Sequence, residues 1–556
     1  MCDFNNKITL ALSLAEKGDL TQAEKICSEI LDINPRHIQG RHLLAYIFIQ
    51  KGDLPTAIKK LLYVIGDAPN ETGLNSTLSK AHMLSGDADK ALFYAQRELQ
   101  INSNSIDNLI DIANIFAENG VLKSAQNYCS KALSINPADK RALELENTII
   151  EKLDQKCFGP MDELIPKNIG RGKHQIIATL RIIGRMGHLI IEPFFLKCLY
   201  DPNKYDIIFI LPPRTLAVSL PVFDLSFRDI FFIEDHSPND RAPLFHLYGN
   251  RLGTHTVGER TYFLEEYSDL FGKAFKKISE GDPPYRAKLN DEELAEGSEL
   301  KNKMGIPEDA SIVTVFVREQ GYLNFIDGHG IRDSNIKNYI EAIKYLVGEG
   351  YYVVRIGDKK MAPLPDLGPQ VIDTPFHSSY TQLVEPYFVS QSAFMLKTVS
   401  GPDALSLIFG IPSLFVNAYV FPSLQALKGD MCVFKTYYSH LYQRELSLRE
   451  IAYDKDILFS IHSDEFAKKK IELLENSSEE ILASTIEMVS HIKGTREPLY
   501  DIDQRFKDLC KQIHYDCKHC SDHKIDITLD ANYFGPYLSN TMISYEFCKA
   551  HPNFLS

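Results

Sequence analysis

The sequence predicts an α-helical solenoid over residues 1–155, followed by two α/β domains over residues 156–303 and 304–495 and a C-terminal tail over residues 496–556 that packs on them. Three observations support this prediction. Small and apolar residues recur with a fixed period at the start of the chain. Strand-like and helix-like segments alternate beyond it, and a charged stretch without clear periodicity divides the alternating part in two.

The first segment is defined by a period of 34 residues that holds through four units. The positions that keep register are Gly18, Gly52, Gly86 and Gly120; Ala23, Ala57, Ala91 and Ala125; Leu10, Leu44, Leu78 and Ile112; and Ala11, Ala45, Ser79 and Ala113. Pro35, Pro69 and Pro137 close three of the units. This pattern resembles the tetratricopeptide repeat (TPR), in which each unit is a pair of helices that buries its apolar face against the next unit.

Each repeated residue type has a physical reason. Small residues such as Ala11 and Ala23 allow two helices to cross closely, and the glycines end the first helix in a left-handed conformation. Asp19, Asp53 and Asp87 are expected to cap the second helix of their units. Stacked units present a concave surface, so the array is expected to bind a protein partner, an acceptor molecule or a second copy of the chain.

Composition excludes several classes of function. The 74 acidic and 60 basic residues give a net charge of −14, which disfavours unaided binding to nucleic acid or to anionic membranes. The 10 cysteines lie mostly in apolar helical patterns and are expected to be reduced and buried. The first residues show no secretory signal, and the uncharged stretch 404–427 is interrupted by glycine and prolines, so we expect a soluble cytoplasmic protein without a transmembrane segment.

Beyond residue 155, β-branched runs alternate with helical patterns. Strands are expected at 175–183, 205–211 and 230–233, and then at 311–317, 351–356, 370–372, 393–396 and 413–416. A helix is expected at 336–348, and residues 281–303 are interpreted as a linker or an exposed helix. This alternation predicts two Rossmann-like halves whose parallel sheets face each other, with the functional site at the carboxyl ends of the strands.

The first candidate site is the turn from Gly184 to Gly187 with His188 directly after it. Two glycines before a helix allow close approach of a ligand to the backbone, and His188 could act as a base or contact the acceptor. The alternative interpretation is an ordinary tight turn with a surface histidine. The glycine pattern lacks the third glycine of a dinucleotide-binding fingerprint, which disfavours an NAD enzyme.

The second candidate is Arg318 at the end of a predicted buried strand, with Arg332 and Asp333 ahead of the next helix. A guanidinium in that position suits a pair of phosphates. Asp333 is either a ligand contact or a helix cap.

Two further turns complete the set. Arg355, Gly357 and Asp358 follow another strand, where Arg355 either reaches a substrate or pairs with Asp358. Ser400 and Gly401 precede a helix expected at 404–409, where backbone N–H groups and a hydroxyl could hold a diphosphate. The alternative there is that Ser400 or Asp403 is a plain helix cap.

Together these turns resemble a family of bacterial glycosyltransferases encoded with surface-polysaccharide genes, whose members often carry TPR units. The resemblance covers roughly residues 170–556 and rests on segments 318–319, 332–339, 352–358 and 400–412, with the shorter segments 187–189 and 542–555. It implies a GT-B type enzyme that uses a nucleotide-activated sugar as substrate and has no obligatory metal or other cofactor. It further implies that the donor diphosphate is held by Arg318, Arg355, Gly357, Ser400 and Gly401.

The same resemblance assigns weaker roles to other residues. Arg332, Asp333, Asp358 and Asp403 would contact the donor or its sugar, and His188 would be the base or an acceptor contact. The acceptor would be a glycan, a lipid-linked molecule or a protein. Two alternatives remain open: an interaction scaffold with a catalytically inactive α/β part, and a nucleotide-sugar enzyme of another kind such as an epimerase.

A Cys/His cluster near the C-terminus is a separate hypothesis. Cys517 and Cys520 have the spacing of metal ligands, and His514 and His523 flank them. A second correctly spaced pair is missing, so the alternative is a helix end with partly exposed thiols.

Overall fold

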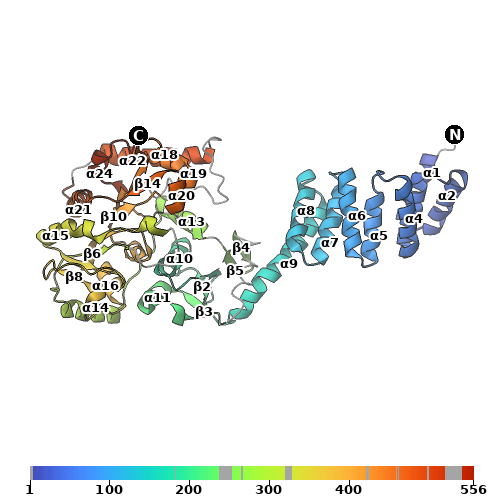
Figure 1. The fold of residues 1–556 in the computed structure, drawn as a ribbon. Helices are drawn as coiled ribbons and strands as arrows, with labels where there is room; N and C mark the ends of the chain where they lie inside the picture. The colour runs from blue at the N-terminus through green and yellow to red at the C-terminus, as the bar shows by residue number, and fades with distance from the viewer. Residues whose placement is uncertain are drawn as a thin grey trace. The chain divides into compact units, whose positions relative to one another are not determined.

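The computed structural model describes residues 4–180, 182–236, 253–264, 267–319, 329–420, 424, 426–458, 460, 463–496, 500–519 and 541–556. These residues form two compact units, one extending to Glu163 and the other beginning at Leu164 (Figure 1).

The first unit is an array of helix pairs, as the 34-residue period predicts (Figure 1). Its helices are α1 (Phe4–Glu16), α2 (Leu20–Ile33), α3 (Ile38–Gln50), α4 (Leu54–Asp67), α5 (Leu74–Leu84), α6 (Ala88–Ile101), α7 (Ile106–Glu118), α8 (Leu122–Ile135) and α9 (Lys140–Leu164). The last helix continues beyond residue 155, where the sequence places the end of the array.

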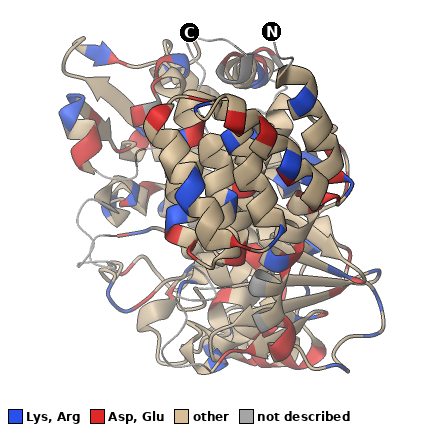
Figure 2. Cartoon of the chain, turned by 90° about the vertical axis from the view of Figure 1, so that its right-hand side faces the viewer, with Lys and Arg blue, Asp and Glu red and all other residues tan. Residues whose placement is uncertain are grey.

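The repeated residues have the conformations expected of them. The four periodic glycines adopt φ values between +73° and +85°, a region that L side chains rarely occupy. The carboxylates of Asp19, Asp53 and Asp87 each accept a hydrogen bond from a backbone N–H in the first turn of the following helix. On the face of the array that Figure 2 shows, basic and acidic residues are interspersed and do not segregate by sign.

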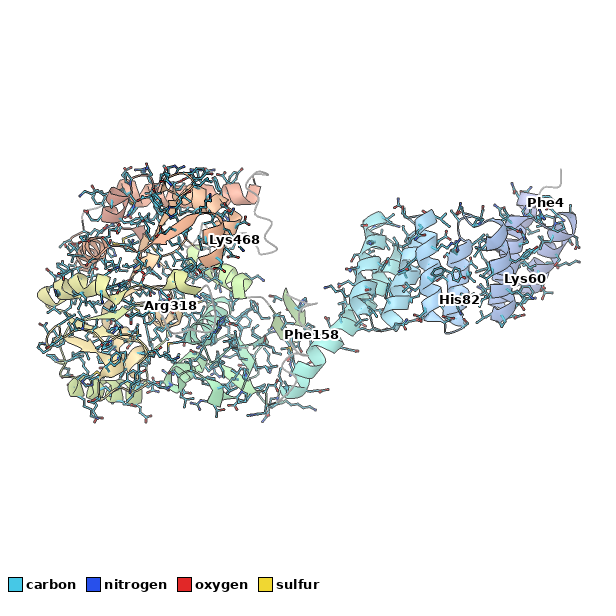
Figure 3. All side chains as sticks on the ribbon, in the orientation of Figure 1. Phe4, Lys60, His82, Phe158, Arg318 and Lys468 are labelled. Carbon is cyan, nitrogen blue, oxygen red and sulfur yellow. The ribbon has the colours of Figure 1, made fainter. Side chains whose placement is uncertain are left out.

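The third helix pair departs from the pattern because polar residues occupy buried positions. Glu98 stands where the other pairs have Ile30, Val64 and Ala132, and it is only 2% exposed. One Glu98 carboxylate oxygen accepts the N–H of Gly73 at 2.7 Å. His82, placed within this pair in Figure 3, occupies a position where the neighbouring pairs have phenylalanine.

The second unit contains two large sheets, one mixed but mainly parallel and one fully parallel. The first has the strand order β3-β2-β1-β5-β4, with β4 antiparallel to β5 and the other neighbours parallel. Its strands are β1 (Gln175–Thr179), β2 (Asp206–Leu211), β3 (Phe231–Glu234), β4 (Gly253–Val257) and β5 (Arg260–Leu264). Its helices are α10 (Met186–Leu199), η1 (Arg214–Leu216), α11 (Leu220–Phe227) and α13 (Tyr267–Ser279). The β4–β5 hairpin has no counterpart in the sequence prediction.

The second sheet has seven strands, all parallel, in the order β15-β11-β10-β9-β6-β7-β8. They are β6 (Ile312–Phe316), β7 (Tyr352–Arg355), β8 (Val371–Asp373), β9 (Ser392–Lys397), β10 (Ser413–Ala418), β11 (Met431–Phe434) and β15 (Met542–Ile543). The associated helices are η2 (His329–Arg332), η3 (Ile336–Tyr339), α15 (Ile340–Gly348), η4 (Thr374–Phe376), α16 (Val384–Ser390), η5 (Gly401–Asp403), α17 (Ala404–Phe409) and α21 (Ser478–Ile492). The first five strands overlap the predicted ones.

The C-terminal part forms a small antiparallel sheet and completes the large one. Its elements are β12 (Thr436–Ser439), β13 (Arg444–Glu445), β14 (Ile471–Leu474), α18 (Leu448–Tyr453), α19 (Lys455–Leu458), α20 (Ser463–Lys468), α22 (Tyr500–His519) and α24 (Tyr545–Ala550). The final residues are tied down by His551, whose two ring nitrogens lie 2.9 and 2.6 Å from the carboxylates of Glu445 and Glu480. The tail therefore supplies an integral strand, β15, and does more than pack on the surface.

The segment between the two sheets joins them. Arg286 donates to the carbonyl of Leu407, and the N–H of Ala287 donates to the carbonyl of Ile408, both at 2.9 Å. The charged stretch ends in a capped helix, α14 (Asp291–Lys303), which packs against α16 through Gly297. One apolar core is continuous across both sheets, so the two halves form a single packed body.

Candidate functional site

The large sheet reverses its strand order between β6 and β9, and the best candidate site lies there. In open α/β sheets, ligands bind at the carboxyl ends of the strands where the order reverses. Arg318 follows β6, and its backbone N–H donates to Thr398 Oγ1, just after β9, at 2.8 Å. Figure 3 labels Arg318 within this unit. Its predicted place at a strand end is thus confirmed.

Three cationic side chains gather around Asp333 at this edge. The Arg318 Nε donates to Asp333 Oδ1 at 2.9 Å, and Lys435, which follows β11, donates its Nζ to the carbonyl of Asp333 at 2.8 Å. The third is Arg332, the neighbour of Asp333 in the chain. Both Arg318 and Lys435 are buried. Asp333 is therefore an ion-pair partner, and the cap of η3 is Asn335.

The electrostatics of this group favour an added anion. Burial lowers the pKa of the Arg318 guanidinium, repulsion by Arg332 lowers it further, and Asp333 opposes both effects. Burial likewise lowers the pKa of the Lys435 ammonium. Because the two arginines repel each other and because Arg318 and Lys435 are desolvated, the group gains from a negatively charged ligand, and phosphate suits the guanidinium geometry. We refer to Arg318, Arg332 and Lys435 as the basic cluster.

The turn after β9 is held by its own side chains. The Ser400 N–H donates to Asp403 Oδ2 at 2.8 Å, so Ser400 is the N-cap of η5 and Asp403 completes its capping box. Lys397 donates its Nζ to the Asp403 carbonyl and to Ser406 Oγ, at 3.0 and 2.7 Å. Asp403 and Lys397 are both buried, which makes them internal supports of this turn. Helix α17 begins and ends where the sequence predicts, at Ala404 and Phe409.

Two of the predicted turns, one from each sheet, touch each other. A Cβ built on Gly401 would lie 2.9 Å from the backbone N of Gly187, and one built on Gly187 would lie 3.3 Å from the Gly401 Cα. Neither position can hold a larger residue without moving the backbone. The contact of Gly187 with Gly401 thus joins the turn that follows β1 to the turn that follows β9, and we call it the junction.

His188 lies in the first turn of α10, next to the junction. Its Nδ1 is 2.8 Å from Glu192 Oε1, one helical turn further along, and the side chain is partly exposed. A carboxylate on one ring nitrogen fixes the orientation of the imidazole. This arrangement is compatible with the predicted role of base or acceptor contact.

Arg355 has a different environment from the predicted one. Its side chain is fully buried, and its guanidinium pairs with Glu319 at 2.8 Å and Asp373 at 3.2 Å. The expected partner, Asp358, instead accepts the N–H of Lys360 at 2.7 Å. With both carboxylates occupying it, Arg355 has no exposed surface for a donor, and we assign it to holding the strand ends together.

Gly357, in the same turn, has a local packing role. It adopts φ +145°, and a Cβ there would lie 2.1 Å from Met361 Sδ. The glycine is therefore required by the turn itself.

Two features of this edge were missed by sequence reasoning. The first is Lys435. It directly follows an apolar run in the sequence, and that position could have indicated a basic residue at a strand end. The other is Glu385 in the first turn of α16, a buried carboxyl beside Asp358 and Tyr380. Burial raises the pKa of Glu385 to about 8, with Asp358 adding to the effect and a hydrogen bond from Tyr380 opposing it. No sequence motif marks Glu385.

The proposed zinc ligands are largely outside the described residues. His514 lies in α22, but the side chain of Cys517 and all of Cys520 and His523 fall outside them. In the part of the chain that the structure describes, no group of three or more His, Cys, Asp or Glu side chains is placed to hold a metal ion. Across those same residues, no helix is both long and apolar enough to cross a membrane.

Comparison with known proteins adds little beyond the helical repeats. No protein-family model matches this sequence. No curated protein matches it either. Among solved structures, a TPR protein of Thermus thermophilus is 20% identical, with 30% of this chain and 93% of that one covered and a TM-score of 0.25.

Two further structures are similar over a comparable share. MamA of Desulfovibrio magneticus RS-1 is 16% identical over 25% of this chain and 78% of its own, with a TM-score of 0.23. A TPR protein of Parabacteroides merdae ATCC 43184 is 18% identical over 29% and 62%, with a TM-score of 0.24. The helical repeat of this chain is defined by its own register and helix pairs.

Proposed function

We propose that this chain is a glycosyltransferase of the GT-B type, which moves a sugar from a nucleotide-activated donor to an acceptor hydroxyl in the assembly of bacterial surface glycans. The observation that carries the proposal is the basic cluster at the strand-order reversal of the large sheet, next to the junction with the first sheet. Two α/β sheets that meet at the junction, with cationic side chains at the strand-order reversal, would suit a nucleoside diphosphate donor.

The proposed reaction follows from the charges at the site. The acceptor oxygen forms a bond to the anomeric carbon of the sugar while the bond to the donor phosphate breaks. The phosphate oxygen keeps the electron pair, and its negative charge is stabilised by Arg318, Arg332 and Lys435. The acceptor proton passes to His188. Because three fixed cations supply the positive charge, this scheme requires no metal ion.

Binding of a nucleoside diphosphate is the direct test. A ligand that binds the native state raises its melting temperature, so UDP, GDP, ADP and CDP and their sugars are screened by thermal shift. Arg318→Ala is expected to weaken binding tenfold or more, because a hydrogen bond to a charged group contributes about 1.5–3 kcal/mol. Arg444→Ala is the matched control, since Arg444 is exposed and pairs with Glu450 away from the basic cluster.

Other outcomes separate the alternatives. A folded Arg318→Ala protein with an undiminished thermal shift would contradict the assignment of the donor site. Consumption of a nucleotide sugar without any acceptor would indicate an epimerase. An unchanged melting temperature with every nucleotide, together with capture of a protein by the helical array, would indicate a scaffold.

A further inference from the structure

Large apolar side chains are exposed on loops beside the junction. Ile182 follows β1, Leu216 lies in η1 after β2, and Leu220 begins α11; these residues are 38%, 49% and 46% exposed to solvent. Phe376, in η4 after β8 of the other sheet, is 42% exposed. We call these four residues the edge patch. All of them lie in the turns, or in the first helical residues, that follow strand carboxyl ends.

Backbone contacts bring these loops together. The Val218 N–H donates to the Ile183 carbonyl at 3.0 Å, and a Cβ on Gly184 would lie 3.6 Å from the Leu216 carbonyl oxygen. The Leu220 N–H donates to Gln382 Oε1 at 3.2 Å, which ties the first sheet to the segment that follows Phe376. Single exposed apolar residues are ordinary, but several on adjoining loops mark a binding surface.

A positive charge accompanies the edge patch. Arg185 lies between Gly184 and the start of α10 and is exposed. Its backbone carbonyl accepts the N–H of Leu189 at 3.1 Å, but within the described part of the chain its guanidinium forms no hydrogen bond or ion pair. The nearby Arg214 is already neutralised by Asp224, and His188 faces Glu192. An unpaired guanidinium three residues after Ile182, on the turn that contacts Leu216, complements a molecule with an anionic head and an apolar chain. A chain with a net charge of −14 would otherwise repel such a molecule.

We propose that the acceptor is a saccharide linked to a lipid phosphate, whose apolar chain packs on the edge patch and whose phosphate pairs with Arg185. This inference rests on the proposed function and names its acceptor class. The acceptor hydroxyl then reaches the junction beside His188, where its oxygen replaces the donor phosphate oxygen on the anomeric carbon and its proton goes to the histidine. A free glycan would use the charge but not the apolar surface.

The chain contains no tryptophan, which allows a single reporter to be placed on the patch. Leu216→Trp is titrated with dodecyl phosphate below its critical micelle concentration, and the indole emission is expected to shift to the blue as the chain covers it. Leu220→Trp is a second reporter in case the first variant does not fold. Leu441→Trp is the matched control, because Leu441 is 61% exposed on the turn between β12 and β13.

Two further variants assign the two parts of the ligand. Arg185→Gln in the Leu216→Trp background is expected to weaken dodecyl phosphate about threefold, as for an exposed ion pair, and to leave dodecyl maltoside unchanged. Leu220→Ser in the same background is expected to weaken both amphiphiles severalfold, because apolar contact is lost for each. Added salt should reproduce the effect of Arg185→Gln on dodecyl phosphate.

Several results would overturn the inference. Equal blue shifts in the Leu216→Trp variant and in the Leu441→Trp control would mean non-specific detergent binding. No shift at either patch reporter, or tighter binding of a phosphopeptide than of dodecyl phosphate, would exclude a lipid acceptor. Nucleoside diphosphate binding is measured separately through Arg318. A negative amphiphile titration therefore leaves the donor site unaffected, and a negative nucleotide assay leaves the amphiphile titration interpretable.

Discussion

Glu385 is a carboxyl whose environment predicts a pH effect on stability. Its pKa is raised by burial to about 8, above the value of 4.5 for an unperturbed glutamate. Between these values the native state binds a proton that the unfolded state has lost. The contribution of Glu385 to the free energy of unfolding is therefore fully present below about pH 4.5. It falls as pH rises to about 8, by up to about 1.4 kcal/mol per pH unit.

Glu385→Gln removes this titration, so its melting temperature should fall less than that of the wild type between pH 5 and pH 8. The two proteins are compared by calorimetry across that range. Glu479→Gln, at an exposed position, should run parallel to the wild type. Parallel curves for Glu385→Gln as well would show that Glu385 is ionised at neutral pH.

His188 is proposed to be the general base that takes the proton of the acceptor hydroxyl. A positioned general base contributes about 10²–10⁴-fold to rate, so His188→Ala is expected to lower kcat of sugar transfer at least 100-fold. Nucleoside diphosphate affinity should stay unchanged, because the basic cluster lies on the other sheet. Glu192→Gln should cause a smaller loss, since it alters only the orientation of the ring. Full transfer activity in His188→Ala across pH would exclude the base role.

Arg318 and Arg355 show how far the sequence could predict this site. Both lie at the carboxyl ends of buried strands, and both were expected to reach a diphosphate. The structure distinguishes them through partners distant in sequence: Glu319 and Asp373 enclose Arg355, whereas Arg318 has Asp333 and a second arginine nearby. The strand ends were predictable from local pattern, but the carboxylates that neutralise one arginine depend on how strands are ordered in the sheet.

The third helix pair is an element in which local composition predicts instability. Both polar atoms of the Asn75 side chain are buried without a hydrogen-bond partner, and the side chain has no solvent exposure. Leu109 holds the equivalent place in the fourth pair. Burying an amide without partners costs about 1–3 kcal/mol, and leucine has the same branching as asparagine.

Asn75→Leu is therefore expected to stabilise α5 and α6 and to slow their amide hydrogen exchange about tenfold in the full chain. The reverse change, Leu109→Asn, should speed exchange in α7 and α8 by a similar factor. Exchange is followed by mass spectrometry on peptides from each helix. Faster exchange in Asn75→Leu would mean that buried water satisfies the amide and that leucine displaces it.

Strands were predictable where an apolar or β-branched run alternates with a helical pattern, and β15 lacked both signals. The strands from β6 to β10 follow β-branched or apolar runs. By contrast, β15 has only two residues, Met542 and Ile543, and pairs with β11 from more than 100 positions away. A segment of that length has no periodicity of its own, so its place in the sheet follows from tertiary packing alone.

The described residues divide into two compact units, one built from repeats and one from sheets. All residues of the basic cluster, the junction and the edge patch belong to the second unit. A fragment of residues 164–556 is therefore expected to fold and to bind the nucleoside diphosphate with the affinity of the full chain. Residues 1–163 should fold as a helical array and show no nucleotide response. Circular dichroism and thermal shift test both fragments.

The kinetic constants of the 164–556 fragment then show what role the helical array has in sugar transfer. If the helix pairs position the acceptor or a partner that delivers it, residues 164–556 should keep kcat and the KM for the donor while the KM for the acceptor rises, because only acceptor encounter uses the missing surface. If the array serves another purpose, such as self-association, all three constants should match those of the full chain. A folded fragment that loses nucleoside diphosphate binding would contradict this division, since it would place part of the donor site in the repeats.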